Sequence, residues 1–446
     1  MARPPRRRGM RPPAILTPSS FPFLLKTPRK TIGFSLPFGL ILSQLLCYDK
    51  GQSIRTGPIP VPTPSRKGAR LMALATVVHP ALAPSRRILA VSDIHGNRAF
   101  FRGLLEKAAF SSRDILVLVG DILEKGPDSL GLLRDILELS QDHTILPVSG
   151  NCDGLVLRFF EDDLWDQGFF RVYLPAHPES ILRQMAREAG LDRWDDLPRL
   201  RECLRRTFPW VWDWLRSLPT ILESEHLVFV HGGVPSLDRM EELDAWHCMK
   251  NDDYWGQDHS FAHTGKYVVV GHWPVTLYDP RIPSAAPIID RARHIISIDG
   301  GCVLKLDGQL NALIIPEESS PDFSWTAYDG LPTARALDPQ APSEDSLNIR
   351  WGRNRVEVLE RGPELSLCRH LETGRVLPIL TSYLYDSPEG LRCEDSTDYL
   401  LPVVPGDCLS IVARTGEMGT LVKKNGVTGW YRGRLNDETK RETKGT

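Results

Sequence analysis

Six residues of this 446-residue chain are of types that bind metal ions, and each follows a short apolar run. They are two aspartates, one asparagine and three histidines: Asp93, His95, Asp121, Asn151, His231 and His272. Carboxylate and amide oxygens with imidazole nitrogens suit Mn, Fe or Zn rather than a metal selected by thiolates. Six ligands are too many for one tetrahedral ion, so we predict two ions that share a carboxylate.

Asp121 is the expected bridging ligand, because it is central in the order of the six and lies in a glycine-bounded turn. Two ions about 3.5–4 Å apart can polarise a phosphoryl oxygen, hold a hydroxide nucleophile and neutralise developing charge. A single Asp or His at a strand end more often closes a loop than binds a metal. Six of them in the same kind of position favour the metal site.

The elements that must position these residues are short strands and helices in alternation. Apolar runs over 87–92, 114–119 and 144–149 predict strands, and amphipathic stretches at 100–108 and from Pro127 predict helices between them. Asp93 and Asp121 are 28 residues apart, and Asp121 and Asn151 are 30 apart, which is one strand–helix–strand unit each time. The polar residues then meet at the carboxyl ends of parallel strands.

Residue composition and apolar runs divide the remaining chain into further regions. Residues 155–222, aromatic and charged without strand-like runs, predict a helical cap over the sheet edge. Strands are expected at 226–231, 266–271 and 294–299, with a hairpin around Asp307-Gly308. Residues 317–346 are expected to be a connector, and 347–436 a small all-β domain that folds separately. The predicted fold class is α/β with a C-terminal all-β domain.

Charge and cysteine content restrict the class of protein. Residues 1–71 hold 13 Lys and Arg and one acid, so we expect them to be disordered or to precede the true start at Met72. The rest of the chain is acidic, which argues against a nucleic-acid partner. The apolar run at 33–47 is too short to span a membrane. Eight cysteines without a CxxC pair favour a reducing compartment, which we take to be the cytoplasm.

The motifs around the candidate ligands resemble those of the calcineurin-like metallophosphoesterases. They read SDIHGN at 92–97, GDILEKG at 120–126, GNCD at 150–153, HGG at 231–233 and GHWP at 271–274. Within that superfamily the chain is similar to the phosphoprotein phosphatase family, whose bacterial members include Ser/Thr phosphatases and diadenosine tetraphosphatases. Runs at 298–303 and 309–313 are similar to the closing segment of those members. The resemblance covers 86–316 and implies a β-sandwich flanked by helices.

The resemblance also assigns the ligands to two ions, Mn being the most expected and Fe or Zn the alternatives. Asp93, His95 and Asp121 would hold the first ion. The second ion would be held by Asp121, Asn151, His231 and His272. A water activated by the two ions would then attack phosphorus in line.

Three positions depart from the family pattern. Lys125 stands where the family has an arginine, so it would meet phosphate as a point charge. Cys152 replaces the histidine that protonates the leaving group, although it can also be a small apolar filler. With Asp121 and Asp153, these two residues form the predicted catalytic set. The second phosphate-binding arginine has no clear match, and Lys250 is a weak candidate for that role.

The expected activity is hydrolysis of a phosphoester or phosphoanhydride, with a dinucleoside polyphosphate or a phospho-Ser/Thr protein as substrate. Poor protonation of a leaving alkoxide by Cys152 favours substrates with good leaving groups. The GNCD variant also keeps a cyclic-nucleotide phosphodiesterase open. A weakly active scaffold that binds a partner through the C-terminal domain is a further alternative.

The C-terminal residues 426–431 resemble a bacterial SH3-type barrel. The resemblance implies a possible peptide or cell-wall ligand. Trp430 and Tyr431 would either line its groove or belong to the core, and the core is the expected place for them.

Overall fold

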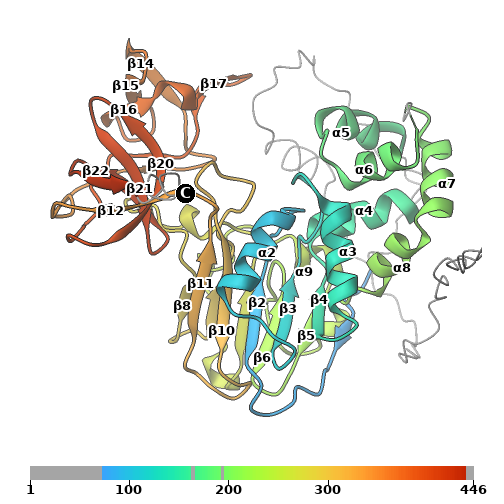
Figure 1. The fold of residues 1–446 in the computed structure, drawn as a ribbon. Coiled ribbons are helices and arrows are strands. Elements are labelled where there is room, and N and C mark those ends of the chain that lie inside the picture. Colours follow the sequence, from blue (N-terminus) through green and yellow to red (C-terminus); the bar gives the residue numbers. More distant parts are fainter. Residues whose placement is uncertain (1–72, 162–165, 192–194, 438–446) are drawn as a thin grey trace, which may run out of the picture.

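The computed structural model describes residues 73–161, 166–191 and 195–437 (Figure 1). The basic N-terminal segment 1–71, with the predictions made for it, lies outside the described residues. In the described ranges, no helix is long and apolar enough to cross a membrane.

The first sheet of the catalytic region carries the predicted strand–helix–strand units. Its strand order is β11-β10-β2-β3-β4, and β2, β3 and β4 are parallel. The strands are β2 (Ile88–Val91), β3 (Ile115–Val119), β4 (Thr144–Val148), β10 (Leu310–Ile315) and β11 (Ser324–Tyr328). Helix α2 (Arg98–Lys107) connects β2 to β3, and α3 (Ser129–Leu139) connects β3 to β4. The side chains of Asn97 and Asp128 cap these helices, which fixes where each turn ends.

A second, six-stranded sheet has the order β1-β5-β6-β7-β9-β8. Its strands are β1 (Val77–Val78), β5 (Ile221–Glu223), β6 (Leu227–Val230), β7 (Tyr267–Val270), β8 (Ile288–Asp290) and β9 (Ile295–Ser297). Phe229, Val269 and Ile296 of this sheet share one core with Val117 and Ala90 of the first. The two sheets therefore form the predicted sandwich.

Strand β3 shows why these runs are apolar at every position. Val117 and Val119 belong to the core between the sheets, whereas Leu116 and Leu118 belong to the core under the helices. Because successive side chains point to opposite faces, a strand covered on both faces needs apolar residues throughout. The loops at the carboxyl ends of these strands therefore start from a core that is packed on both faces.

Helices occupy the region predicted as a cap, 155–222. They are α4 (Asn151–Glu161), a π-helix (Asp166–Phe170), α5 (Arg171–Ala176), α6 (Ile181–Glu188), α7 (Leu197–Thr207) and α8 (Pro209–Ser217). Figure 1 shows α5 to α8 grouped beyond the β4 edge of the first sheet. Their apolar faces join the same core as α2 and α3.

The prediction of a hairpin around Asp307-Gly308 is wrong. Strand β9 lies in the second sheet and β10 in the first, so the residues between them cross from one sheet to the other. A single parallel bridge joins Gly301 to Gln309. An Asp-Gly pair favours a tight turn but does not decide whether the flanking strands pair with each other.

The segment 317–346 contains two strands, which belong to different sheets. Strand β11 pairs with β10 in the catalytic region, and β12 (Thr333–Ala336) pairs with β20 and β23. The sheet of β12 has the order β22-β21-β20-β12-β23, with β20 (Cys408–Thr415), β21 (Gly419–Lys424), β22 (Val427–Tyr431) and β23 (Leu435–Asp437). The connector is thus folded, and the C-terminal β region comprises residues 333–437.

The C-terminal β region has a second group of strands with a core of its own. They are β13 (Asn348–Ile349), β14 (Val356–Arg361), β15 (Leu365–His370), β16 (Val376–Leu380), β17 (Leu384–Ser387), β18 (Gly390–Cys393) and β19 (Ser396–Thr397). The Asn425-Gly426 turn joins β21 to β22 with positive φ at both residues, as the sequence predicts. The SH3-type resemblance stays a prediction.

Trp430 and Tyr431 are core residues of the C-terminal β region. Their exposed fractions are 2% and 0%. The indole of Trp430 donates to the carbonyl oxygen of Thr397 at 2.8 Å, and the hydroxyl of Tyr431 donates to that of Asp338 at 2.8 Å. Both rings thus lie in the core, as expected. Because Trp430 also lines a pocket beside Asp307 and Thr428, the interpretation of this ring as part of a ligand groove stays a prediction.

Candidate metal centre

The structure brings the six candidate ligands together at the carboxyl ends of the strands. Nε2 of His95 lies 3.7 Å from Oδ1 of Asp93 and 3.8 Å from Oδ2 of Asp121. Nε2 of His231 lies 3.3 Å from Oδ1 of Asp121. The rings of His231 and His272 are 5.2 Å apart between centroids. Asp121 lies in the middle of this group, as a bridging ligand must.

Hydrogen bonds determine which ring nitrogen of His231 and of His272 can bind a metal ion. Nδ1 of His231 donates to the carbonyl oxygen of Val119 at 2.8 Å, so Nε2 keeps its lone pair toward Asp121. Nε2 of His272 donates to Oδ1 of Asp252 at 2.8 Å, which leaves Nδ1 for an ion. A carboxylate or carbonyl behind a metal-bound histidine is the usual way to orient the ring.

Asp252 is a functional candidate that the sequence reasoning missed. The segment from 249 to 253 reads MKNDD, and the sequence directed attention to Lys250 alone. Only the folded loop shows which of the two aspartates reaches His272. An acidic residue between the last two histidines was the available signal, but acidic residues are common on loops.

Unpaired polar atoms in the centre fit a bound cation. Oδ1 of Asp93, Oδ1 of Asn151 and Nε2 of His231 are buried without a hydrogen-bond partner among the described residues. Nε2 of His95 is in the same condition. Burying an unpaired polar atom costs about 1–3 kcal/mol. Four such atoms around one carboxylate are explained by divalent ions that these atoms would bind.

The backbone of the centre is strained in the same place. Thirteen non-glycine residues in the described ranges have positive φ, and six of them lie in the metal centre. Four are candidate ligands, Asp93, His95, Asp121 and His272, and the other two are the neighbouring residues Glu124 and Lys125. Left-handed backbone costs a residue with a side chain about 1–3 kcal/mol and gathers at functional sites. The surrounding fold therefore maintains these turns against their local preference.

Two glycines of the motifs allow the loops to approach each other closely. A Cβ atom on Gly150 would lie 2.0 Å from the backbone nitrogen of Asp121. A Cβ atom on Gly271 would lie 2.4 Å from Oδ2 of Asp93. A side chain at either position would push two candidate ligands apart, so the glycines of GN and GH are required by packing.

Charge in the centre is arranged around Asp121. Burial alone would raise the pKa of its carboxyl group, but the neighbouring imidazoles of His231 and His95 hold that pKa well below its usual value. Burial lowers the pKa of His231, and the carboxylates of Asp121 and Asp93 outweigh it and raise that pKa to about 9 when no ion is present. An ion bound at Nε2 would take the place of the proton that this nitrogen then carries. Asp121 is thus an anion at neutral pH, ready to pair with cations.

Both candidate lysines lie at the centre. The ammonium group of Lys125 lies near Cys152, Asp121 and Asp93, which raise its pKa against the effect of burial. Nζ of Lys250 pairs with Asp252 and lies 3.2 Å from Nε2 of His272. The place of both charges fits the predicted contact with phosphate, which stays a prediction.

Asp153 does not have the geometry of a catalytic group. Its carboxylate is fully buried and accepts hydrogen bonds from the backbone nitrogens of Gly150, Ile122 and Leu123 at 3.0, 3.2 and 3.0 Å. Both oxygens are therefore occupied by the loops that follow β3 and β4. We correct its assignment from catalytic residue to positioning residue for these two loops.

Glu124 connects the centre to the cap. Its buried carboxylate accepts from the hydroxyl of Tyr173 at 2.6 Å, from the hydroxyl of Ser180 at 2.9 Å and from the backbone nitrogen of Ile181 at 2.9 Å. Tyr173 belongs to α5, and Ser180 caps α6. Because Glu124 precedes Lys125, the cap helices hold the loop that carries this lysine.

Comparison with known proteins agrees with the motifs. Residues 86–296 match the model of the calcineurin-like phosphoesterase family. This part of the chain is a calcineurin-like metallophosphoesterase domain, which confirms the resemblance found in the sequence for that region.

Named relatives match parts of the chain. A symmetrical bis(5'-nucleosyl)-tetraphosphatase of Chromohalobacter salexigens is 31% identical over 33% of this chain and 44% of its own length. One from Nitrosospira multiformis is 28% identical over 43% of this chain and 60% of its length. Serine/threonine-protein phosphatase 2 of Escherichia coli is 35% identical over 17% of this chain and 34% of its length. The chain spans less than two thirds of each.

Proposed function

We propose that this protein is a hydrolase that cleaves a phosphoanhydride of a dinucleoside polyphosphate at a two-ion centre. The observation that carries the proposal is the group of buried, unpaired ligand atoms around Asp121. The relatives named bis(5'-nucleosyl)-tetraphosphatases support the substrate class. Mn is the proposed metal, and the cytoplasm is the proposed compartment, since all seven described cysteines are free.

Different residues would bind the ions, attract the substrate and orient the ligands. Divalent ions bound to the six ligands would supply an activated water and charge to neutralise the phosphoryl oxygens. Lys125 and Lys250 add positive charge beside them, which attracts and orients a polyphosphate. Asp252 and the carbonyl oxygen of Val119 hold the imidazoles of His272 and His231 in place.

The choice of an anhydride over a phosphoserine rests on position 152. The thiol there is 2% exposed, and no histidine stands in its place to protonate a departing alkoxide. Help of that kind contributes typically about 10²–10⁴-fold. A nucleotide phosphate leaves as a stable anion without it, so anhydrides suffer less from the substitution.

The test is a hydrolysis assay of the full chain with Mn²⁺ on diadenosine tetraphosphate, a phosphoserine peptide, a cyclic nucleotide and bis-p-nitrophenyl phosphate. We expect diadenosine tetraphosphate to be hydrolysed fastest. Asp121→Asn should abolish turnover and lower bound metal, whereas Asp142→Asn, the same change at an exposed residue, should alter neither. A preference for the peptide or the cyclic nucleotide would replace this proposal with the corresponding alternative, and no turnover at all would favour the scaffold.

A further inference from the structure

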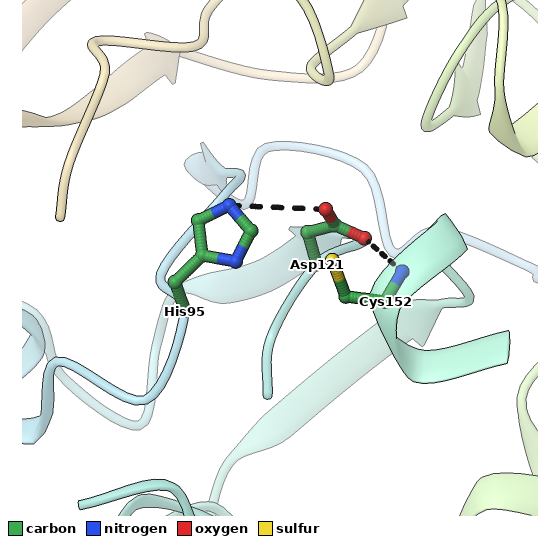
Figure 2. A group of neighbouring side chains, drawn as sticks. All are labelled: His95, Asp121 and Cys152. Carbon is green, nitrogen blue, oxygen red and sulfur yellow. Dashed lines mark hydrogen bonds and ion pairs between the residues drawn. The ribbon is translucent and has the colours of Figure 1, made fainter. Parts of the chain in front are cut away.

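Cys152 lies within the metal centre, among the ligands predicted for the first ion. Its Sγ atom, a ring nitrogen of His95 and a carboxylate oxygen of Asp121 all lie within 4.8 Å of one another. Figure 2 shows these three side chains grouped together, with dashed lines from Asp121 to His95 and to the backbone nitrogen of Cys152. The sequence presented this cysteine only as a substitute acid or a filler.

Unpaired atoms of His95 and its neighbour Asp93 are a second observation that points to an ion beside this group. Nε2 of His95 and Oδ1 of Asp93 are fully buried and have no hydrogen-bond partner in the part of the chain that the structure describes. They lie 3.7 Å apart, which is too far for a hydrogen bond. That spacing fits two ligands of one ion, since metal–ligand bonds are about 2.0–2.3 Å long.

The backbone holds the sulfur in this position. Cys152 lies in the first turn of α4, and its backbone nitrogen donates to Oδ1 of Asp121 at 2.7 Å. Cys152 is 2% exposed, so its sulfur lies in the interior of the protein beside these ligand atoms. Burial and the carboxylate of Asp121 raise the pKa of this thiol well above its usual value, although the ammonium group of Lys125 acts in the opposite direction. The charge of a bound divalent ion would therefore have to replace the thiol proton, as it does at other metal-bound thiols.

We propose that the thiolate of Cys152 is a ligand of the ion that His95 and Asp121 hold. The thiol proton would pass to a hydration water of the entering ion, which leaves as the metal–sulfur bond forms. The proposal rests on the two-ion centre proposed above and adds a sulfur donor to one side of it. Because thiolates favour Zn or Fe over Mn, the two positions differ in metal preference, and Mn is left for the position of Asn151, His231 and His272.

The experiment uses the full chain loaded with Co²⁺, whose bonds to thiolate give an intense charge-transfer absorption in the near ultraviolet. We expect this band in the wild type and its loss in Cys152→Ser. Cys248→Ser is the matched control, since Cys248 is also 2% exposed and belongs to α9 (Ala245–Met249), outside the group of potential ligand atoms. The control should keep the whole band.

The outcomes separate this proposal from the function proposed above. Two bound Co²⁺ ions without the band would overturn the sulfur ligand and leave the two-ion hydrolase standing. A wild type that binds no metal would overturn both. Should Cys152→Ser not fold, X-ray absorption of the Zn²⁺-loaded wild type decides the question. A sulfur neighbour at about 2.3 Å from zinc supports the proposal, and a shell of oxygen and nitrogen alone refutes it.

Discussion

At the scale of single residues, Asp252 decides which nitrogen of His272 faces the metal centre. Its carboxylate accepts a hydrogen bond from Nε2 at 2.8 Å and thereby fixes both the tautomer and the ring plane. Partners of this kind typically contribute about 10–100-fold to metal affinity. We therefore predict that Asp252→Asn weakens metal binding by about 10–100-fold, as measured by competition with a chromogenic chelator.

The neighbouring residue supplies the control for that prediction. Asp253 is exposed, and its left-handed backbone tolerates asparagine. Asp253→Asn therefore removes the same negative charge from the loop but leaves the hydrogen bond between Asp252 and His272 in place. Equal loss of metal affinity in the two variants would mean that general acidity of the loop, not the hydrogen bond to His272, is responsible.

At the scale of elements, the cap and the loop after β3 are joined through Glu124. The hydroxyl of Tyr173 is the donor that α5 contributes to this buried carboxylate. Tyr173→Phe removes the donor without changing the ring, and an unpaired buried oxygen costs about 1–3 kcal/mol. We predict a loss of that size in the free energy of unfolding, measured in urea.

Tyr328 provides the comparison for the change at Tyr173. Its ring packs edge-on against Phe100, with 5.5 Å between the ring centroids, and the residue is only partly buried, so water can reach it. Tyr328→Phe should lower the free energy of unfolding by much less than Tyr173→Phe does. If both variants unfold at the same urea concentration as the wild type, the tie between Glu124 and the cap contributes nothing to stability.

At the scale of the whole molecule, the C-terminal β region is fastened to the loops between His272 and β10. Lys305 pairs with Asp395, and the side chain of Lys423 reaches the backbone of Asp307. Asn348 donates to the carbonyl oxygens of Thr276 and Asp279 at 3.0 and 2.8 Å. The separate folding that the sequence predicts for this region stays a prediction, and these contacts show where the region would have to part from the catalytic region.

The pH dependence of stability tests this interface. Burial raises the pKa of Asp307, but Lys305 and Lys423 outweigh it and lower that pKa from 3.8 to about 2. A carboxyl group with a depressed pKa in the folded state stabilises it fully above its unfolded value and progressively less as pH falls. We predict that the wild type loses stability as pH falls from about 4 to about 2.

Asp307→Asn isolates the contribution of this carboxylate. The variant should be less stable at pH 6, and its unfolding midpoint in urea should fall less than that of the wild type over the acid range. Asp322→Asn, at an exposed residue, should follow the wild-type curve. A variant at 307 with the wild-type acid dependence would show that other carboxyl groups carry the effect.

The sequence alone predicted the parallel strands and the six candidate ligands at their ends, because both depend on short-range patterns. Apolar runs ending in Asp93, Asp121 and Asn151 at regular intervals require parallel strands whose carboxyl ends meet. The tertiary structure decided what depends on contacts between distant segments. Asp252 behind His272, Asp153 under two loops and Cys152 beside His95 are brought together by packing across the two sheets and the cap. Their spacing along the chain carries no periodic signal, so only the folded chain shows which donor each carboxylate meets.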